Sequence, residues 1–203
     1  GITKFCIHPE IIFRTKKHIG GTKKIDHHKI DLINPDLIIA NKEENTKEDI
    51  ETLEKKYPVW ISDIGILDDA INMITGLGEI TGKQTEAFEI NKTIKNKFSI
   101  ISPLPSTRSL YLIWRKPFMA AGNDTFINDM MSRCGFENVL GNQSRYPELD
   151  AAMTRELNPE IILLSSEPYP FKQEHLAEIK EIVPDCTIEL VDGEYFSWYG
   201  SRL

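Results

Sequence analysis

Two glutamates in matching positions are the first residues of this chain that could take part in chemistry. Glu43 ends segment 34–43 (NPDLIIANKE), and Glu167 ends segment 158–167 (NPEIILLSSE), 124 residues later (158 minus 34). Each glutamate follows an apolar run that predicts a strand and precedes a predicted helix, so we expect it in a turn. A carboxylate held at a turn pairs well with arginine through two parallel hydrogen bonds. Two facing carboxylates could also act as a catalytic pair. The alternative is a solvated acid near a helix N-terminus, which the helix dipole favours.

The histidines and cysteines form no recognisable catalytic or metal-binding motif. His27 and His28 are adjacent and would point in different directions on a helix, whereas zinc-binding pairs use spacings such as i and i+4. The scattered histidines and cysteines, which show neither a convergent pattern nor a CxxC pair, are His8, His18, His175, Cys6, Cys134 and Cys186. GxSxG, Walker A and GxGxxG motifs are absent from the sequence. We expect no catalytic residues and no bound metal of its own. An enzyme using the glutamate pair or a His27-His28 zinc, a direct metal-ion receptor, and a sensor or scaffold remain as alternatives.

The composition limits the class of protein. The 203 residues are 40% hydrophobic and 27% charged, with a net charge of −7, which is normal for a globular domain. The absence of a basic block argues against nucleic-acid binding, because phosphate neutralisation needs clustered Lys and Arg. We interpret the basic stretch 14–24 as a solvated loop. No apolar run approaches the roughly 20 residues that cross a bilayer, and no signal peptide is visible.

The duplicated segment predicts the first set of elements. Residues 2–6 resemble a strand already under way, and 27–33 a short helix with Ile30 and Ile33 inward. The continuous apolar run 37–40 is typical of a strand covered on both faces of a parallel sheet. Asn45-Thr46 and the following acids predict a helix start, and that helix places Ile50, Leu53 and Tyr57 on one face. With a strand at 59–62, in which we interpret Trp60 as a core residue, this forms a βαβ unit.

The middle of the chain is predicted to be helical. Apolar residues from 67 to 77 recur at helical spacing, and Gly76, Gly78 and Gly82 are expected to break that helix. A second helix, about 83–102, carries an apolar stripe from Ala87 to Ile101 and ends at Pro103 and Pro105. It would be roughly 30 Å long and could connect two lobes as a rigid strut.

The last third repeats the first. Strands are predicted at 110–114, 161–164 and 187–191, and helices after Asn123-Asp124-Thr125, at 149–157 and at 173–183, with a loop at 192–194. Gly135 suits the left-handed residue after a helix end. The chain therefore divides into an N-terminal lobe (1–64), connecting helices (65–105) and a C-terminal lobe (106–203).

Ligand-binding candidates are the side chains that follow the predicted strands, because ligands of parallel sheets bind beyond the carboxyl ends of the strands. Aromatic faces would suit a flat macrocycle or a catechol-type chelate, and cations would suit an anionic chelate. The candidates are Phe5, Cys6, His8, Asn41, Lys42, Trp114, Arg115, Lys116, Tyr146, Ser166, Trp198 and Tyr199.

An ordered series of short motifs extends over nearly the whole chain: 1–9 (GITKFCIHP), 32–38 (LINPDLI), 77–83 (LGEITGK), 134–139 (CGFENV), 167–171 (EPYPF), 192–194 (DGE) and 198–202 (WYGSR). Each motif alone is weak, but the ordered series resembles the substrate-binding proteins of ABC importers for cobalamin, iron siderophores and haem. The resemblance is greatest to members labelled cobalamin-binding. In this class, also described as class III periplasmic binding proteins, a single long helix links two Rossmann-like lobes.

The resemblance implies an α/β fold of two Rossmann-like βα lobes joined by a long backbone helix, with a ligand cleft between them. It implies a monomeric receptor without bond-making chemistry or a cofactor of its own. The receptor would capture cobalamin or a related metal chelate and deliver it to a membrane permease. Asn41 stands where a cobalamin-binding relative has an aromatic side chain, so a ferric siderophore or haem remains an alternative ligand.

The resemblance also gives the two glutamates a role. It implies that one acid on each lobe pairs with permease arginines, and the repeat offers Glu43 and Glu167, with Glu44 and Glu48 as neighbouring alternatives. The implied location is the periplasm, or an anchor on the outer face of the inner membrane. Family members begin with a further strand and helix before the segment that matches residue 1, so we expect a trimmed N-terminus.

Overall fold

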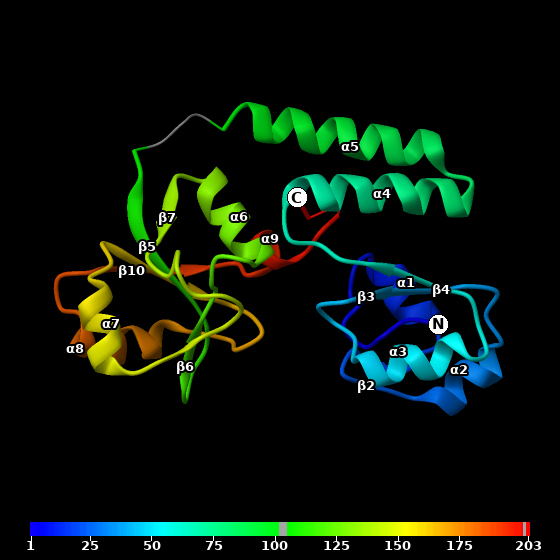
Figure 1. Ribbon diagram of the computed structural model, residues 1–203, viewed down its shortest axis with the longest axis horizontal. Coiled ribbons are helices and arrows are strands. Elements are labelled where there is room, and N and C mark those ends of the chain that lie inside the picture. Colours follow the sequence, from blue (N-terminus) through cyan, green and yellow to red (C-terminus); the bar gives the residue numbers. More distant parts are fainter. Residues whose placement is uncertain (102–104, 201) are drawn as a thin grey trace. The chain divides into compact units, whose positions relative to one another are not determined.

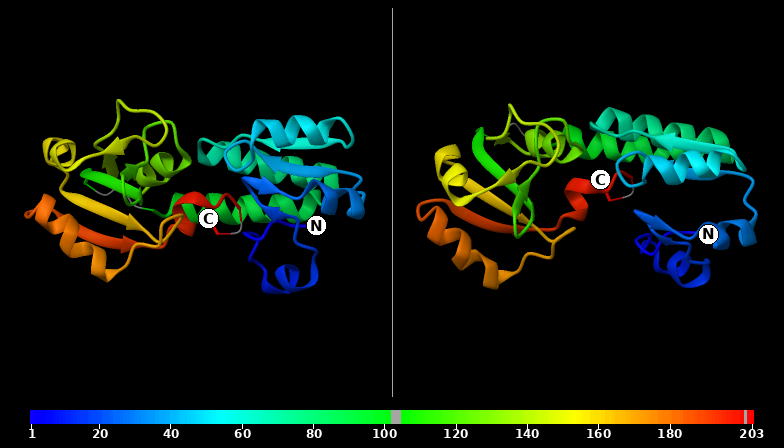
Figure 2. Two further views of the ribbon diagram at one scale, coloured as in Figure 1. Left: turned by 90° about the horizontal axis from the view of Figure 1, so that it is seen from below. Right: turned by 60° about the horizontal axis from the view of Figure 1, so that its bottom comes forward.

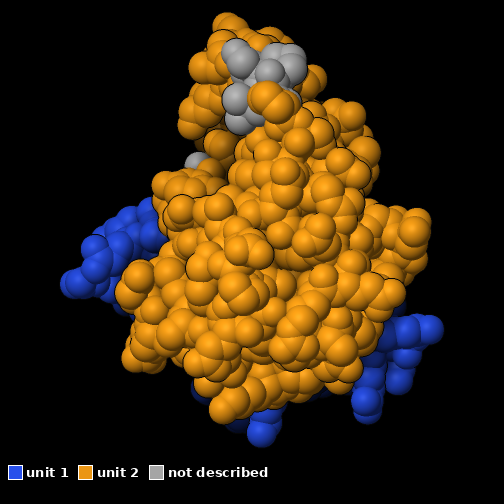
Figure 3. Space-filling model, turned by 90° about the vertical axis from the view of Figure 1, so that its left-hand side faces the viewer, with its two compact units in different colours: residues 1–64 blue, residues 65–203 orange. Residues whose placement is uncertain are grey.

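The computed structural model describes residues 1–101, 105–200 and 202–203. They form two compact units, unit 1 (residues 1–64) and unit 2 (residues 65–203), which Figure 3 colours separately. Both units combine strands and helices, and the predicted α/β class with two βα lobes is confirmed. The helices predicted to connect the lobes belong to unit 2. Pro103, predicted to end the second of them, lies outside the described residues.

Unit 1 contains the predicted βαβ unit. Strands β3 (Ile38–Asn41) and β4 (Val59–Ser62) pair in parallel over their whole length. Helix α3 (Lys47–Glu54) lies between them in sequence and begins after Thr46, whose hydroxyl accepts a hydrogen bond from the backbone N–H of Asp49. This contact satisfies one of the unpaired N–H groups of the first helical turn.

Two details of this unit differ from expectation. Ile50 and Leu53 of α3 are buried as predicted, but Tyr57 lies beyond the end of the helix and donates its hydroxyl hydrogen to Asp31. The strand β3 was predicted to be covered on both faces, yet the side chain of Ile39 is 53% exposed. A continuous apolar run predicts a strand, but burial of both faces depends on what packs against the sheet, which has only two strands among the described residues.

The remaining elements of unit 1 are α1 (Glu10–Thr15), β1 (Gly20–Gly21), β2 (Lys24–Ile25) and α2 (His27–Ile33). Helix α2 matches its prediction, with Ile30 buried. The strand predicted at 2–6 is wrong, because only Ile2 forms an isolated bridge, to His18. The chain then turns, with the backbone N–H of Cys6 bonded to the carbonyl of Thr3.

Unit 2 begins with two helices that lie side by side, α4 (Leu67–Thr81) and α5 (Gln84–Ser99) (Figures 1 and 2). Of the glycines predicted to break the first helix, only Gly82 does so, in the left-handed conformation (φ 68°). Gly78 lies inside α4, where a Cβ atom would approach the Cβ of Ala87 to 2.5 Å. It therefore permits the close contact between the two helices.

The second helix is shorter than predicted. Its 16 residues correspond to about 24 Å rather than 30 Å, and it packs along α4 within unit 2. The predicted apolar stripe is only partly covered. Ala87 and Ile94 are buried, whereas Ile90 and Ile101 are exposed.

The main sheet of unit 2 has the order β10-β9-β5-β6-β8, with β7 paired to β5. Its strands are β5 (Thr107–Trp114), β6 (Phe118–Ala120), β7 (Phe136–Asn138), β8 (Glu148–Leu149), β9 (Ile161–Ser165) and β10 (Thr187–Val191). Strand β9 pairs in parallel with both β5 and β10. The three strands predicted from sequence are confirmed, and β5 starts three residues earlier than predicted.

Helices cover both faces of this sheet (Figure 1): α6 (Phe126–Arg133), α7 (Ala151–Leu157), η1 (Gln173–His175), α8 (Leu176–Ile182) and α9 (Glu194–Ser197). Alternate residues of β5 enter two cores. Leu110 and Leu112 pack in one with Ile179 of α8, while Tyr111 packs in the other with Ile127 of α6. The sheet is thus buried from both sides.

Three helix boundaries in unit 2 differ from the predictions. Leu149 pairs with Phe118 in β8, so the helix predicted at 149–157 starts only at Ala151. The segment predicted as one helix at 173–183 opens with the 3-10 turn η1. The predicted loop at 192–194 runs directly into α9. The helix after Thr125 and the left-handed Gly135 (φ 81°) are as predicted.

The sequence repeat is also a structural repeat. Helices α2 and α7 each have seven residues, and each ends at an asparagine in the left-handed conformation, Asn34 (φ 49°) and Asn158 (φ 46°). Each also begins after an aspartate that caps it, because Asp26 and Asp150 accept a hydrogen bond from the backbone N–H three residues on. The capping pair keeps the same offset of 124 (150 minus 26).

Candidate functional site

The carboxyl ends of the parallel strands in unit 2 bring several candidates to one edge. Strands β5, β9 and β10 run in parallel and in register, with Leu112 opposite Leu164 and Ser165 opposite Val191. Trp114 ends β5, and Ser166 follows β9 directly. Parallel strands place such residues at the same edge of a sheet, as predicted.

Trp114 and Arg115 are held at this edge by residues on the α8 side. Trp114 is 40% exposed, and its ring meets Tyr169 edge-on at 5.8 Å. Arg115 donates its Nε–H to the carboxylate of Glu178 in α8 at 2.6 Å. Contacts with Glu178 and with Tyr169 raise the pKa of the guanidinium. The charge of Arg115 is thus partly compensated within the unit, whereas Lys116, in the turn to β6, is exposed.

Tyr169 is itself fixed by a cluster of rings. It packs against Phe171 at 4.8 Å and against His175 at 5.4 Å. The Nε2 atom of His175 lies 3.1 Å from the Tyr169 hydroxyl, and its Nδ1 accepts the backbone N–H of Lys172. Because Nδ1 is an acceptor, a neutral His175 carries its hydrogen on Nε2 and donates it to Tyr169. The cluster braces the half-exposed Trp114.

Tyr146 and Tyr199 lie on the opposite, α6 side of the sheet. Tyr146 packs against the core that contains Tyr111 and Ile127, and Arg145 stacks over its ring at 5.5 Å. Tyr199 meets Phe126, the first residue of α6, edge-on at 5.0 Å. The structure therefore divides the predicted aromatic residues of unit 2 between the two faces of the sheet.

Glu167 has partners within unit 2. Its Oε1 atom accepts hydrogen bonds from the indole Nε1–H of Trp198 at 2.6 Å and from the hydroxyl of Ser197 at 2.5 Å. Its backbone N–H donates to the hydroxyl oxygen of Ser165. The predicted docking acid of unit 2 is therefore bonded to the segment that carries two predicted ligand residues.

The equivalent turn in unit 1 is closed by Asn41. Its Oδ1 accepts the backbone N–H groups of Glu43 and Glu44 at 3.0 and 3.1 Å, and its Nδ2 donates to the Ser62 hydroxyl at 3.0 Å. Such Asx turns stabilise the exit from a strand. The polar atoms of Asn41 thus have internal partners, and the neighbouring Lys42 pairs with the exposed Asp63.

Glu43 itself is half-buried, and its carbonyl oxygen accepts a hydrogen bond from Lys23 at 2.5 Å. The alternative docking residues Glu44 and Glu48 are exposed. Glu43 and Glu167 thus occupy equivalent turns of the repeat in different local surroundings.

The N-terminal candidates lie in an irregular segment. Phe5, Cys6 and His8 are exposed, with Lys4 stacked over the Phe5 ring at 5.0 Å and the Cys6 thiol 3.4 Å from the Thr3 hydroxyl. They follow a turn rather than the end of a strand. Trp60, interpreted as a core residue, is half-buried.

Within residues 1–101, 105–200 and 202–203, no group of three or more His, Cys, Asp or Glu side chains is close enough to hold a metal ion. In the same part of the chain, no helix has both the length and the apolar character that a membrane crossing requires.

Tyr169 and Ser197 support the site residues, although their sequence context did not identify them. Tyr169 belongs to segment 167–171, which stood out only as a motif, and Ser197 precedes Trp198 without any pattern of its own. An aromatic residue soon after a predicted strand, as in Pro168-Tyr169-Pro170, is the signal that could have identified Tyr169. No local signal predicts the bond between Ser197 and Glu167, which are 30 residues apart.

Comparison with known proteins identifies the family. Solved structures with the same fold include three periplasmic proteins of low sequence identity to this chain. The periplasmic vitamin B12-binding protein BtuF of Vibrio cholerae is 16% identical with a TM-score of 0.75, covering 98% of this chain and 81% of that one. A periplasmic haem-binding protein of Pseudomonas aeruginosa is 15% identical with a TM-score of 0.83 (100% and 79%). A possible iron-binding periplasmic protein of Staphylococcus epidermidis is 20% identical with a TM-score of 0.78 (96% and 81%).

The search of curated protein sequences gave no significant match. The sequence model of one family, described as periplasmic binding protein, matches residues 8–182, which is most of the chain. This chain therefore belongs to the periplasmic binding protein family.

Proposed function

We propose that this chain is the substrate-binding protein of an ABC importer. It captures cobalamin or a related metal chelate, and a membrane permease receives the ligand from it. The family match supports the receptor role. Structures of the same fold include proteins named for binding vitamin B12 and haem, and one named as part of an ABC-type ferric hydroxamate transport system. Its place of action is the periplasm or the outer face of the inner membrane. In this proposal the chain acts as a monomer, without bond-making chemistry and without a cofactor of its own.

The observation that carries the ligand class is the braced aromatic residue at the sheet edge of unit 2. Trp114 exposes 40% of its surface although Tyr169 fixes it from one side. A rigid, half-exposed indole offers a large flat contact at low entropy cost. Lys116 and the partly compensated Arg115 add positive charge nearby, which suits the carboxylates or catecholates of a chelate.

The other proposed ligand residues keep the roles inferred from the sequence. They are Phe5, Cys6, His8, Asn41, Lys42, Tyr146, Ser166, Trp198 and Tyr199. For Asn41, the internal hydrogen bonds mean that a ligand would meet the turn it closes rather than a free amide. Ferric siderophores and haem are the alternative ligands, and a direct metal-ion receptor, a sensor or an enzyme on this fold is a less favoured reading.

The ligand proposal is tested by calorimetric titration with cyanocobalamin, a ferric siderophore and haem in parallel. We expect one of them to bind, and Trp114→Ala to weaken that binding by about tenfold or more, as for a buried aromatic contact. Phe88→Ala is the matched control, because Phe88 is a 64% exposed aromatic on α5 away from the strand ends. Binding of none of the three ligands by the wild-type chain would contradict the proposal.

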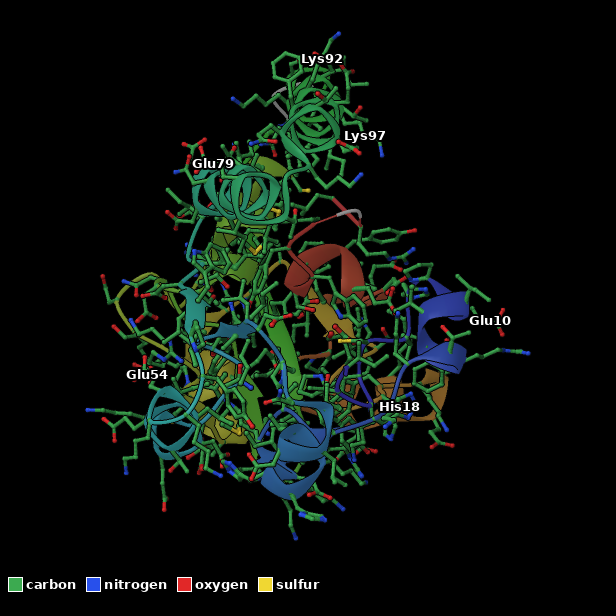
Figure 4. The ribbon with its side chains drawn as sticks, turned by 90° about the vertical axis from the view of Figure 1, so that its right-hand side faces the viewer. Glu10, His18, Glu54, Glu79, Lys92 and Lys97 are labelled. Atoms are coloured by element: carbon green, nitrogen blue, oxygen red, sulfur yellow. The ribbon has the colours of Figure 1, made fainter. Side chains whose placement is uncertain are left out.

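Permease docking is a separate proposal for Glu43 and Glu167. It is tested by measuring the affinity of the ligand-loaded chain for the permease in lipid nanodiscs. Glu43→Ala should weaken docking without changing ligand affinity, since a carboxylate paired with arginine across an interface contributes through its charge. Glu79→Ala, an exposed acid of α4 (Figure 4), serves as the control. A Glu43 variant that docks like the wild type would exclude this residue.

A further inference from the structure

The turn after β9 and the segment after β10 are joined through one carboxylate oxygen. Trp198 donates its indole N–H to Oε1 of Glu167 at 2.6 Å, and the Ser197 hydroxyl donates to the same atom at 2.5 Å. All three residues are half-buried. Hydrogen bonds to a charged acceptor are shorter and about twice as strong as neutral ones. An indole has a single donor, so this bond fixes the direction in which the N–H edge of Trp198 points.

The surrounding backbone holds the acceptor in place. The Tyr111 hydroxyl donates to Ser165, and the Ser165 hydroxyl donates to the carbonyl oxygen of Glu167. Burial, together with the nearby Glu167 carboxylate, raises the pKa of Tyr111, so its hydroxyl stays protonated. The Glu167 carboxylate thus projects from a turn that is itself anchored in the core.

The segment after β10 packs directly against this turn at Gly193. A Cβ atom on Gly193 would lie 2.4 Å from the Ser165 hydroxyl oxygen and 2.6 Å from Cγ of Glu167, so only glycine fits. The backbone N–H of Gly193 also donates to the Ser166 hydroxyl at 3.0 Å. This close approach puts Ser197 and Trp198 within reach of the carboxylate.

We propose that Glu167 is a positioning residue, whose carboxylate orients the Trp198 indole at the edge of the unit 2 sheet. The importance of this orientation for a ligand rests on the proposed function, in which Trp198 and Tyr199 contact the chelate. Tyr199 follows Trp198 directly and packs on Phe126, so the same anchor helps to place both rings. Glu167 contributes to ligand affinity without touching the ligand, because a ring held in position loses less entropy on binding.

The contact is tested first without any ligand. The chain has three tryptophans and should give three indole N–H signals in a proton–nitrogen NMR spectrum, of which Trp198→Phe identifies one. Glu167→Ala should move the Trp198 proton upfield and speed its exchange with solvent, while the signals of Trp60 and Trp114 stay in place. A Trp198 signal that is unchanged in Glu167→Ala would overturn the proposal.

The second measurement is the ligand affinity of two Glu167 variants, which separates the hydrogen-bonding role of this side chain from its negative charge. Glu167→Gln keeps an oxygen acceptor but removes the charge, so it should retain ligand affinity within about twofold, whereas Glu167→Ala should lose about tenfold, the typical effect of removing one hydrogen-bond acceptor. Equal losses in the two variants would overturn the positioning role. If Glu167→Ala does not fold, Trp198→Phe takes its place, and Glu167→Gln should cause no further loss in that background.

The outcomes also distinguish the positioning role of Glu167 from its proposed role in permease docking and from the proposed receptor function. Loss of permease docking in Glu167→Gln with ligand affinity retained would add docking to positioning, because only the charge has changed. Failure of the wild-type chain to bind any of the three chelates would remove the proposed function, while the indole signals still decide whether Glu167 orients Trp198.

Discussion

The two copies of the repeated segment have the same local structure but different surroundings. In both, a capped seven-residue helix ends at a left-handed asparagine, and a strand and a tight turn follow. In unit 2 the strand β9 lies between two parallel neighbours and is buried on both faces. In unit 1 the strand β3 pairs with β4 alone among the described residues, and Ile39 is 53% exposed. The same local signals therefore form the same elements, whereas burial depends on what packs around them.

In the turn after each strand, a different polar side chain at the equivalent position accepts the same backbone hydrogen bond. Asn41 and Ser165 are equivalent in the repeat, and each accepts the backbone N–H two residues later, at 3.0 and 3.2 Å. In unit 1 the side chain also bonds to Ser62 of the neighbouring strand, and in unit 2 to Tyr111. A short polar acceptor at this position is therefore part of the turn, and its presence does not by itself mark a ligand site.

The largest difference between the copies is expected in their cores. Leu163 in β9 and Ile39 in β3 are equivalent, but Leu163 is only 2% exposed. Leu163→Ala should lower the free energy of unfolding by about 2–5 kcal/mol, because it leaves a cavity, and Ile39→Ala by less than about 1 kcal/mol. Urea unfolding followed by circular dichroism measures both. A large loss for Ile39→Ala would show that something covers this strand in solution.

A smaller effect is expected at the turn of unit 1. Asn41→Ala removes the acceptor of two backbone N–H groups and should destabilise unit 1 by about 1–3 kcal/mol. Asn41→Asp keeps that acceptor and loses only the donor to Ser62, so it should cost less. Amide hydrogen exchange of residues 43 and 44 reports on the turn directly. Equal protection in the wild type and in Asn41→Ala would disprove the role of this side chain.

The helix caps should respond alike in the two copies. Asp26→Ala and Asp150→Ala should each cost about 1 kcal/mol, the usual value for the loss of an N-cap, and serine at either position should restore most of it. Thermal unfolding of the four variants tests this. A cost at one site alone would mean that the repeat is less symmetrical in its energetics than in its geometry.

The smallest expected effect is a difference in acid sensitivity. The backbone N–H of Lys29 lowers the pKa of Asp26, and hydrogen bonds from Lys56 and Tyr57 lower that of Asp31. Carboxyl groups with a lowered pKa stabilise the folded state above their ordinary pKa, near 4, and lose that contribution as the pH falls through the lowered value. In the described part of unit 2, Glu86 is the carboxyl whose pKa is lowered, through its contact with Lys83.

Unit 1 should therefore lose protection first when the pH is lowered below about 4. Amide hydrogen exchange at a series of pH values measures this difference. The protection of residues 26–56 is compared with that of strands β5 and β9. Asp31→Asn should reduce the acid sensitivity of unit 1, because it removes one of the groups with a lowered pKa. Simultaneous loss of protection in both units would show that they unfold together.

Local patterns predicted most of the elements but not the partners of the site residues. The continuous apolar run 161–164, the cap at Thr125 and the left-handed Gly135 act through neighbouring residues, so they could be read directly from the sequence. The prediction of a strand at 2–6 was wrong because a strand needs a neighbouring strand to pair with, and only one bridge, from Ile2 to His18, forms there. The length of α5 was overestimated because apolar spacing continues beyond the residue at which the helix ends.

The sequence by itself determined the family of this protein, the repeat and the types of side chain that follow each strand, since these depend on residue order and short-range preferences. Only the tertiary structure decided which of those side chains have internal partners. It joins Glu167 to Trp198 across 31 residues and Arg115 to Glu178 across 63. It also braces Trp114 with Tyr169 and closes the turn after β3 with Asn41. These contacts depend on which strands become neighbours in the sheets, and that is settled by the packing of the whole unit.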